Sequence, residues 1–356
     1  MIELLKTWYQ RNFSDPQAMI LALLLTLGFI VVIFFGDMLA PLLASVVIAY
    51  LLEGTVAKLQ KHGVARLWAV IAVFSLFMAL LVFTILGLIP LLSQQLSELV
   101  REVPNMVTQG QQALLSLHEA YPTFFSEEQV RELMSGVRAD LTGFGQSVLS
   151  KSIASIPALV TVLVYLILVP IMVFFFLKDK FAIVEWFTSY LPEKRMLAKQ
   201  VWQEMDLQIG NYIRGKILEI IIVGTVTYIA FAMMGLNYAP LLAALVGLSV
   251  LVPYIGAAVV TLPVALIAYF QWGLSSEFGY LILVYGVIQA LDGNVLVPVL
   301  FSEAVNLHPV AIIAAVLVFG GFWGFWGVFF AIPLATLVKA VLNAWPKAAH
   351  PISHSE

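Results

Sequence analysis

The chain has 356 residues, of which 62% are hydrophobic and only 11% are charged, and its mean hydropathy is +0.99. Soluble globular domains carry about 25% charged residues, so this composition excludes that class and indicates a polytopic helical membrane protein. The net charge of −3 argues against nucleic acid as a partner, and the absence of cysteine excludes disulfides and cysteine-metal sites.

The first half of the chain contains four apolar runs that are expected to cross a membrane. They cover residues 18–35, 39–52, 68–88 and 156–177. The first run has no small-residue cleavage site near its end, so we expect a retained span rather than a removed signal peptide. Asp37 is expected to mark a tight turn between the first two spans, where it would be an ordinary solvated residue.

Residues 89–155 differ in character from the spans on either side. Pro104 and two further prolines are expected to punctuate helical stretches, and seven acidic residues accompany four basic ones. Ser126 followed by Gln129 fits a helix capping box. We interpret this segment as a small soluble helical insert.

The basic residues predict the orientation of the chain. The N-terminus, the loop near residue 60, residues 178–216 and the C-terminal tail hold 2, 3, 7 and 2 of the 18 lysines and arginines. The positive-inside rule then places both termini in the cytoplasm and the insert outside it. Within 178–216, the stretch FAIVEWFTSYL is typical of an interfacial helix, with Trp186 and Tyr190 at headgroup level.

The second half of the chain combines two further spans with two broken hairpins. Residues 217–235 and 280–301 are predicted to span. The first hairpin, residues 238–270, is expected to break at Val252-Pro253-Tyr254-Ile255-Gly256. The second hairpin, residues 307–342, is expected to break at a glycine-aromatic turn that contains Gly324 and Gly327.

The two hairpins indicate a weak inverted repeat. Each follows a span with an acid, and each has prolines in similar places, Pro240 and Pro263 in one and Pro309 and Pro333 in the other. In transporters such repeats place the substrate site between the two copies. Because arms of roughly 14 residues are short for full crossings, the hairpins either span or re-enter, which leaves between six and ten spans.

Asp292 is the strongest candidate for a site residue. An acid at the centre of a membrane helix costs about 2.5–3.5 kcal/mol on insertion scales, so Asp292 should face protein or water. Gln289 and Asn294 are close enough in sequence to share its polar face. The functional interpretation is a substrate or proton site; the structural one is a helix–helix hydrogen bond or a helix end nearer the surface.

The other candidates have simple structural alternatives. Glu219 follows Lys216 by three residues, so a local ion pair in the headgroup region explains it. Pro309 sets a helix start, which explains the pair with His308 better than a metal site does. The glycine-rich turns offer either close packing or an unwound backbone at a cavity. The candidate substrate- or ion-binding residues are Asp292, Gln289, Asn294, Glu219, Pro253, Gly256, His308, Pro309, Gly324 and Gly327.

The sequence contains none of the familiar catalytic motifs. It has no paired-histidine zinc motif, no nucleophile elbow and no phosphate-binding loop, so we expect neither an enzyme nor a metal or other cofactor. A protease with two intramembrane aspartates is disfavoured because Asp37 and Asp292 lie at different expected depths.

An ordered set of short motifs extends over nearly the whole chain. The motifs are Leu39-Ala40-Pro41, Ala49-Tyr50-Leu51-Leu52, Leu191-Pro192, Tyr212-Ile213-Arg214-Gly215, Val252–Gly256, Gln289-x-x-Asp292-Gly293-Asn294 with Pro298, Leu307-His308-Pro309, Gly324, Gly327 and Ala331-Ile332-Pro333-Leu334. In this set the chain resembles the autoinducer-2 exporter family of bacterial permeases. Two departures are visible. Glu53-Gly54 stands where the family usually has a proline, and Lys216 stands where glutamine is common.

The resemblance implies a secondary transporter of the bacterial inner membrane that exports a small polar solute such as autoinducer-2. The alternative that it allows is a sodium (or lithium)/proton antiporter on the same fold, and it implies a homo-oligomer. A non-transporting scaffold whose insert recruits an external partner is the remaining alternative. The expected organisation is three spans in 1–88, the insert in 89–155, the fourth span and an amphipathic segment in 156–216, the transport core in 217–345 and a cytoplasmic tail in 346–356.

Overall fold

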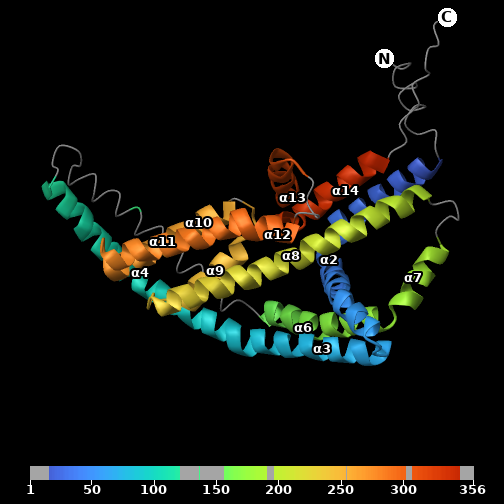
Figure 1. The fold of residues 1–356 in the computed structure, drawn as a ribbon, viewed down its shortest axis with the longest axis horizontal. Coiled ribbons are helices and arrows are strands. Elements are labelled where there is room, and N and C mark those ends of the chain that lie inside the picture. The colour runs from blue at the N-terminus through green and yellow to red at the C-terminus, as the bar shows by residue number, and fades with distance from the viewer. Residues whose placement is uncertain are drawn as a thin grey trace, which may run out of the picture. The chain divides into compact units, whose positions relative to one another are not determined.

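The computed structural model describes residues 16–120, 136, 156–190, 196–253, 255–301 and 307–344. In these ranges all regular secondary structure is helical (Figure 1). The elements are α2 Pro16–Lys61, α3 Arg66–Phe83, η1 Thr84–Leu88, α4 Ile89–Ala120, α6 Ile156–Lys178, α7 Lys180–Ser189, α8 Met196–Met233, α9 Ala239–Ser249, α10 Ile255–Trp272, α11 Ser276–Leu291, η2 Asp292–Leu296, α12 Val297–Phe301, α13 Pro309–Phe329 and α14 Ala331–Ala344.

Six helical stretches are long and apolar enough to cross a membrane, and a seventh arises if the bent pair α6–α7 is one span. The six are Met19–Gly36, Met38–Lys61, Arg66–Gln112, Met196–Met233, Ile255–Trp272 and Ser276–Phe301. A helix satisfies its own backbone hydrogen bonds, which is why helices serve as spans. The predicted all-α polytopic membrane fold is therefore confirmed.

Two predicted breaks are absent from the structure, and one predicted hairpin arm is longer than expected. The prediction of a tight turn at Asp37 is wrong, because α2 stays helical through Asp37 and Pro41. The two halves of α2 nevertheless run in different directions (Figure 1). Pro104 also lies inside a helix, α4, rather than ending one. Finally α10, expected to be a short hairpin arm, has 18 residues and qualifies as a span.

Several expectations fall on residues that the structure does not describe. The capping box at Ser126 and Gln129 lies in 121–155, and the tail 346–356 lies beyond 344. Only the first part of the predicted insert, within α4, is described; there the helix continues without interruption from α3 through η1.

The chain divides into two compact units. The first unit contains Met1–Ser75, Tyr165–Leu218 and Val297–Glu356, and the second contains Leu76–Val164 and Glu219–Leu296.

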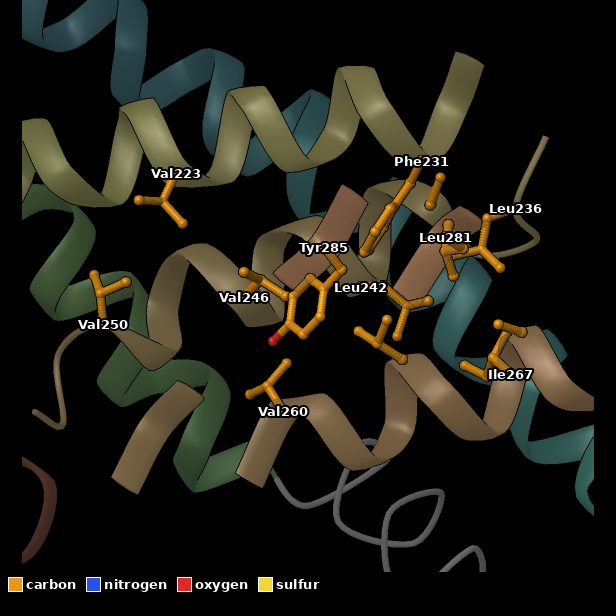
Figure 2. Packing of buried hydrophobic residues seen from close by; sticks show 13 residues of the cluster. Val223, Phe231, Leu236, Leu242, Val246, Val250, Val260, Ile267, Leu281 and Tyr285 are labelled. Atoms are coloured by element: carbon orange, nitrogen blue, oxygen red, sulfur yellow. The ribbon is translucent and has the colours of Figure 1, made fainter. Parts of the chain in front are cut away.

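The core of the second unit joins α8, α9, α10 and α11 (Figure 2). Phe231, Leu242, Val264 and Leu281 come from these four helices in turn and are fully or almost fully buried. The helices α8 and α9 cross closely, because a Cβ at Gly247 would lie 3.0 Å from the Gly224 Cα. Close backbone approach through small residues is how membrane helices gain packing energy when lipid removes the hydrophobic driving force.

The first unit packs α8 against α12, α13 and α14. Tyr212 and Ile213 of α8 are buried with Phe301, Ile312 and Ile332. A Cβ at residue 215, a glycine, would meet the Phe301 ring at 2.8 Å. The Tyr-Ile-Arg-Gly motif on α8 is therefore a packing motif in this unit.

Candidate functional site

The span Ser276–Phe301 is interrupted at Asp292. The α11 helix starts after Ser275, whose hydroxyl accepts from the Phe278 backbone N–H at 3.4 Å, and runs to Leu291. Residues Asp292–Leu296 then form a π-helical turn, and α-helix resumes at Val297. π-Helical turns inside α-helices are rare and frequently occur at functional sites.

The local sequence explains this interruption. Pro298 has no backbone N–H and leaves the Asn294 carbonyl without its α-helical donor, which weakens the ladder just after the turn. Gly293 adds backbone freedom within it. The Asn294 side chain donates from Nδ2 to the Ala290 carbonyl oxygen at 2.8 Å, so it helps to satisfy the backbone where the register changes.

Gln289 and Asp292 place buried polar atoms beside this turn. They lie three residues apart, so they are neighbours on one side of the helix. Both Gln289 Nε2 and Asp292 Oδ1 are shielded from solvent, and Gln289 Nε2 has no hydrogen-bond partner among the described residues. The pair combines an amide donor with a carboxylate acceptor. Asn294 differs, because its side chain is exposed and bonds to its own helix.

Tyr285 extends the polar side of α11, and Thr261 of α10 lies beside it. The sequence analysis predicted neither residue. Tyr285 is 3% exposed, and its hydroxyl lies 3.2 Å from Thr261 Oγ1 on α10. Tyr285 precedes Gln289 by four residues, which places them on adjacent turns of one helix face. That spacing was readable from the sequence, whereas the contact with Thr261 was not.

Glu219 is buried on α8, with 2% of its surface exposed. Arg214, which precedes Glu219 by five residues, donates within its own helix to the Gly210 carbonyl at 2.9 Å and to Asn211 Oδ1 at 3.3 Å. An ion pair of Glu219 with a basic neighbour therefore stays a prediction. The burial itself makes Glu219 the second acid in the second unit that is held away from solvent.

Pro253 lies in the turn between α9 and α10, and Gly256 lies in the first turn of α10. The hairpin breaks here as predicted, between Ser249 and Ile255. Gly256 is buried, and a Cβ at this position would collide with the Ser249 carbonyl oxygen. Close backbone packing therefore requires glycine at 256, and a binding role for the turn stays a prediction.

His308 and Pro309 start helix α13. His308 is the N-cap, and its Nδ1 accepts from the Val310 backbone N–H at 3.3 Å, while Pro309 occupies the first turn. The His308 side chain satisfies one of the backbone N–H groups that a helix N-terminus leaves without a partner, and Pro309 has no N–H to satisfy. The helix-start interpretation of this pair is confirmed.

The second hairpin turns within α13, as predicted, because the backbone leaves the helical conformation at Gly324, three residues before Gly327. Gly324 has φ 57° and ψ −131°, a conformation that glycine adopts far more readily than other residues. Gly327 is buried, and a Cβ there would collide with the Phe319 carbonyl oxygen. The break follows from backbone geometry that only glycines provide.

The candidate residues are divided between the two units. Glu219, Pro253, Gly256, Gln289, Asp292 and Asn294 belong to the second unit, and His308, Pro309, Gly324 and Gly327 belong to the first. The structure brings Gln289, Asp292 and Tyr285 onto one helix. Within the described ranges no group of three or more His, Asp or Glu residues is placed to hold a metal ion.

Comparison with known proteins gives one consistent family. The model of the "AI-2E family transporter" matches residues 19–347. "Putative permease PerM" of Escherichia coli (strain K12) is 50% identical over 346 residues, which cover 97% of this chain and 98% of that protein. "Putative transport protein YueF" of Bacillus subtilis (strain 168) is 25% identical over 315 residues, covering 87% of this chain and 84% of that protein. The predicted resemblance is confirmed, and the chain belongs to the AI-2E transporter family.

Proposed function

We propose that the protein is a secondary permease of the bacterial inner membrane that moves a small polar solute past Asp292, with autoinducer-2 as the first candidate. The observation that carries this proposal is the π-helical turn that starts at Asp292 inside an apolar span, beside the buried Gln289 Nε2. A membrane helix gains no stability from such an arrangement, because polar groups in the bilayer are costly. A passing solute that hydrogen-bonds to the amide of Gln289 and the carboxylate of Asp292 would explain why the protein keeps these costly polar groups in the span.

The charges in the 219–296 part of the second unit restrict the solute. From Glu219 to Leu296 the sequence contains three acids, Glu219, Glu277 and Asp292, and no lysine, arginine or histidine. An anionic solute would find no opposite charge there, and burying an unpaired charge is expensive. We therefore expect the solute to be neutral or cationic. A hydroxylated neutral molecule would use the amide of Gln289 and the carboxylate of Asp292 together.

A sodium (or lithium)/proton antiporter is the second candidate function. The observation that favours it is the presence of two shielded carboxyl groups, Glu219 and Asp292, in one unit. Acids inside membrane helices commonly bind cations or relay protons. In that case the two acids themselves, rather than the amide of Gln289, would carry the transported ion.

The test is solute flux in proteoliposomes, with wild type and Asp292→Asn side by side. Autoinducer-2 and an imposed sodium/proton gradient are measured separately. Glu277→Gln is the matched control, since it removes an exposed acid from the first turn of the same α11. We expect Asp292→Asn to lower flux at least about tenfold, because a hydrogen bond to a charged group contributes about 1.5–3 kcal/mol.

The outcomes separate the alternatives. Autoinducer-2 flux lost in Asp292→Asn and kept in Glu277→Gln supports the permease, and sodium/proton exchange with the same pattern supports the antiporter. Flux that survives Asp292→Asn shows that Asp292 is structural and refutes the proposed site. No flux of either solute in folded wild-type protein refutes both candidate functions.

A further inference from the structure

Most of the short helix α7 is exposed in the described structure, and its first residues, Lys180 and Phe181, contact Glu53 and Arg66. It leaves the end of α6 at 80°, with Asp179 at the bend, and none of its ten residues is buried (Figure 1). An isolated helix of this length is marginal in water. Its stability must come from a surface that covers it.

One side of α7 is apolar and aromatic. Five large side chains are 52–73% exposed, namely Phe181, Val184, Trp186, Phe187 and Tyr190. The Trp186 ring contacts the rings of Phe187 and Tyr190, with centroids 4.9 and 5.2 Å apart. At 100° per residue, Val184, Trp186, Phe187 and Tyr190 cover about 160° of the helix, Glu185 and Ser189 lie opposite the centre of that face, and Phe181 lies about 40° from Glu185. This is the distribution found in helices that lie in a membrane interface.

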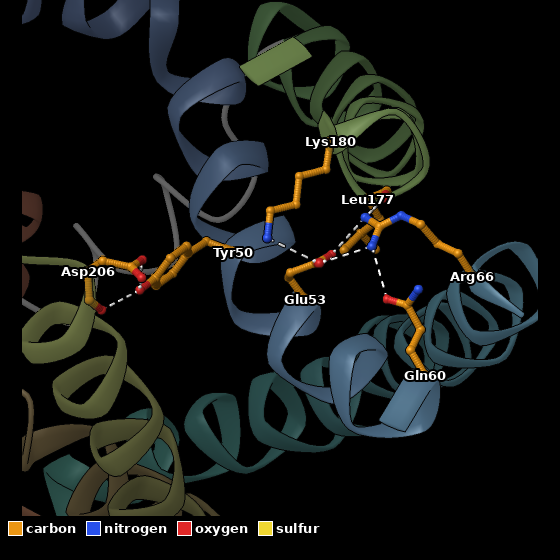
Figure 3. Close-up of polar contacts among 7 residues, drawn as sticks. All are labelled: Tyr50, Glu53, Gln60, Arg66, Leu177, Lys180 and Asp206. Carbon is orange, nitrogen blue, oxygen red and sulfur yellow. Dashed lines mark hydrogen bonds and ion pairs between the residues drawn. The ribbon is translucent and has the colours of Figure 1, made fainter. Parts of the chain in front are cut away.

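The beginning of α7 is basic. Lys178 and Lys180 have side chains that are 44% and 42% exposed, and the guanidinium of Arg66 lies 4.7 Å from the Phe181 ring centroid. Both Arg66 and Lys180 reach the single carboxylate of Glu53, at 3.1 and 3.2 Å (Figure 3). Lys178 lies 3.7 Å from Asp179, so three cations against two acids leave one net positive charge at this corner.

We propose that α7 docks on an anionic phospholipid surface, with its aromatic side in the headgroup region and Lys178 and Lys180 against lipid phosphates. A bilayer fits better than a protein partner for two reasons. The helix begins directly after an apolar helix of the bent span, so its start lies at a membrane boundary. Tryptophan and tyrosine beside lysine are also the residues that gather in this layer, and the lysines are attracted to anionic headgroups.

Arg66 fixes the direction in which α7 leaves. Besides binding Glu53, it donates to the Leu177 carbonyl in the last turn of α6, a group that a helix C-terminus leaves without a donor. Lys180, the first residue of α7, is held to the same Glu53. Side chains on α2 and α3 therefore fix the bend. As a result, the orientation of α7 is set by the protein before the helix contacts lipid.

Spin labelling tests this proposal directly, because the chain has no cysteine. Val184→Cys and Ser189→Cys are conservative in size and point about 140° apart on the helix. Each labelled variant of the full-length protein is reconstituted in phosphatidylcholine alone and in phosphatidylcholine mixed with phosphatidylglycerol. Accessibility of the nitroxide to oxygen, which is concentrated in lipid, and to a water-soluble nickel complex reports its depth.

We expect label 184 to favour oxygen and label 189 to favour nickel, with a larger contrast in the anionic membrane. Lys178→Gln should reduce the effect of phosphatidylglycerol without disturbing Glu53, whereas Glu185→Gln should not reduce it. Nickel access to both labels in both membranes would overturn the docking. Shielding of both labels from both reagents would also overturn it, since that pattern means a protein partner such as a second copy. Equal depth in the two membranes would overturn the requirement for anionic lipid.

Discussion

Gly256 and Gly327 are the residues on which the two hairpin turns depend. Each lies near the start of the returning arm, and at each a Cβ would collide with a backbone carbonyl of the first arm, that of Ser249 or of Phe319. A backbone carbonyl has little room to move in a packed turn. The two hairpins thus share a local device, which is what an internal repeat predicts.

Gly256→Ala should destabilise the protein by about 1–3 kcal/mol, the usual cost of overpacking. Gly286→Ala is the control, because Gly286 lies inside α11, where an added Cβ would have nothing within 4 Å. Alanine there should be neutral or stabilising by about 0.5–1 kcal/mol. Thermal unfolding in detergent measures both. A Gly256→Ala protein as stable as wild type would contradict the packing argument.

His308→Ala should lower stability by about 0.5–2 kcal/mol, as loss of an N-cap does. His308→Asn should retain most of that stability, since asparagine is a strong N-cap residue and keeps an acceptor for the Val310 N–H. Transport by the asparagine variant should match wild type. If the asparagine variant folds as wild type does but loses transport, His308 has a role beyond capping.

For single residues, the sequence identified the unusual residue types correctly but did not predict their surroundings. Asp292 and the turn glycines stood out because acids and glycines are unusual in apolar runs. The contact of Tyr285 with Thr261 could not be predicted, since it depends on how α10 packs against α11. Glu219 was assigned to the headgroup region from its basic neighbours, but it is 2% exposed because tertiary packing of α8 determines burial.

The interrupted span α11–η2–α12 is the element most closely tied to function. Its interruption depends on a missing donor at Pro298 and on backbone freedom at Gly293. Pro298→Ala supplies the N–H that can bond to the Asn294 carbonyl. The helix is then free to continue as an α-helix, which moves the side chain of Asp292 relative to the rest of α11.

We therefore expect Pro298→Ala to preserve or raise the unfolding temperature while lowering flux. Positioning errors of about 1 Å reduce the rate of well-organised sites strongly, by up to about 100-fold. Flux and thermal unfolding are measured on the same preparation. Undiminished flux at unchanged stability would show that the π-helical turn is dispensable.

A second testable element is the corner where α2, α3, α6 and α7 meet. Glu53 is 14% exposed in its side chain and accepts from Arg66 through both oxygens and from Lys180 (Figure 3). Glu53→Gln should cost about 1–3 kcal/mol, because it leaves partly buried cations with a weaker acceptor. Glu185→Gln, on the exposed side of α7, should change stability by less than about 0.5 kcal/mol. Equal unfolding temperatures for the two variants would contradict this assignment.

Element boundaries were predicted less well than element types. Apolar runs identified the spans, but the helices extend well past them: α8 begins at Met196 and the helix of the third span continues into α4. A helix satisfies its own backbone in lipid and in water alike, so a change in composition does not end it. Pro41 and Pro104 also lie inside helices, since neighbouring groups satisfy the freed carbonyls in such cases.

For the whole molecule, composition was decisive. With 11% charged residues and several long apolar runs, the chain had only one class of fold available to it, and family membership then followed from ordered short motifs. Among the described residues of the second unit, the buried polar groups belong to Glu219, Thr227, Gln289 and Asp292, and none of these is basic. The proposed function requires that the side of α11 with Gln289 and Asp292 faces a path for polar solutes rather than lipid.

Thiol accessibility in intact membranes tests that claim without knowledge of the solute. Gln289→Cys places a thiol on the polar side of α11, and Val287→Cys places one on the same helix at a position that is 49% exposed and apolar. A charged maleimide reacts only with thiols that water reaches. We expect labelling at 289 and none at 287. Failure of 289 to react in folded protein, or equal reaction at both positions, would contradict it.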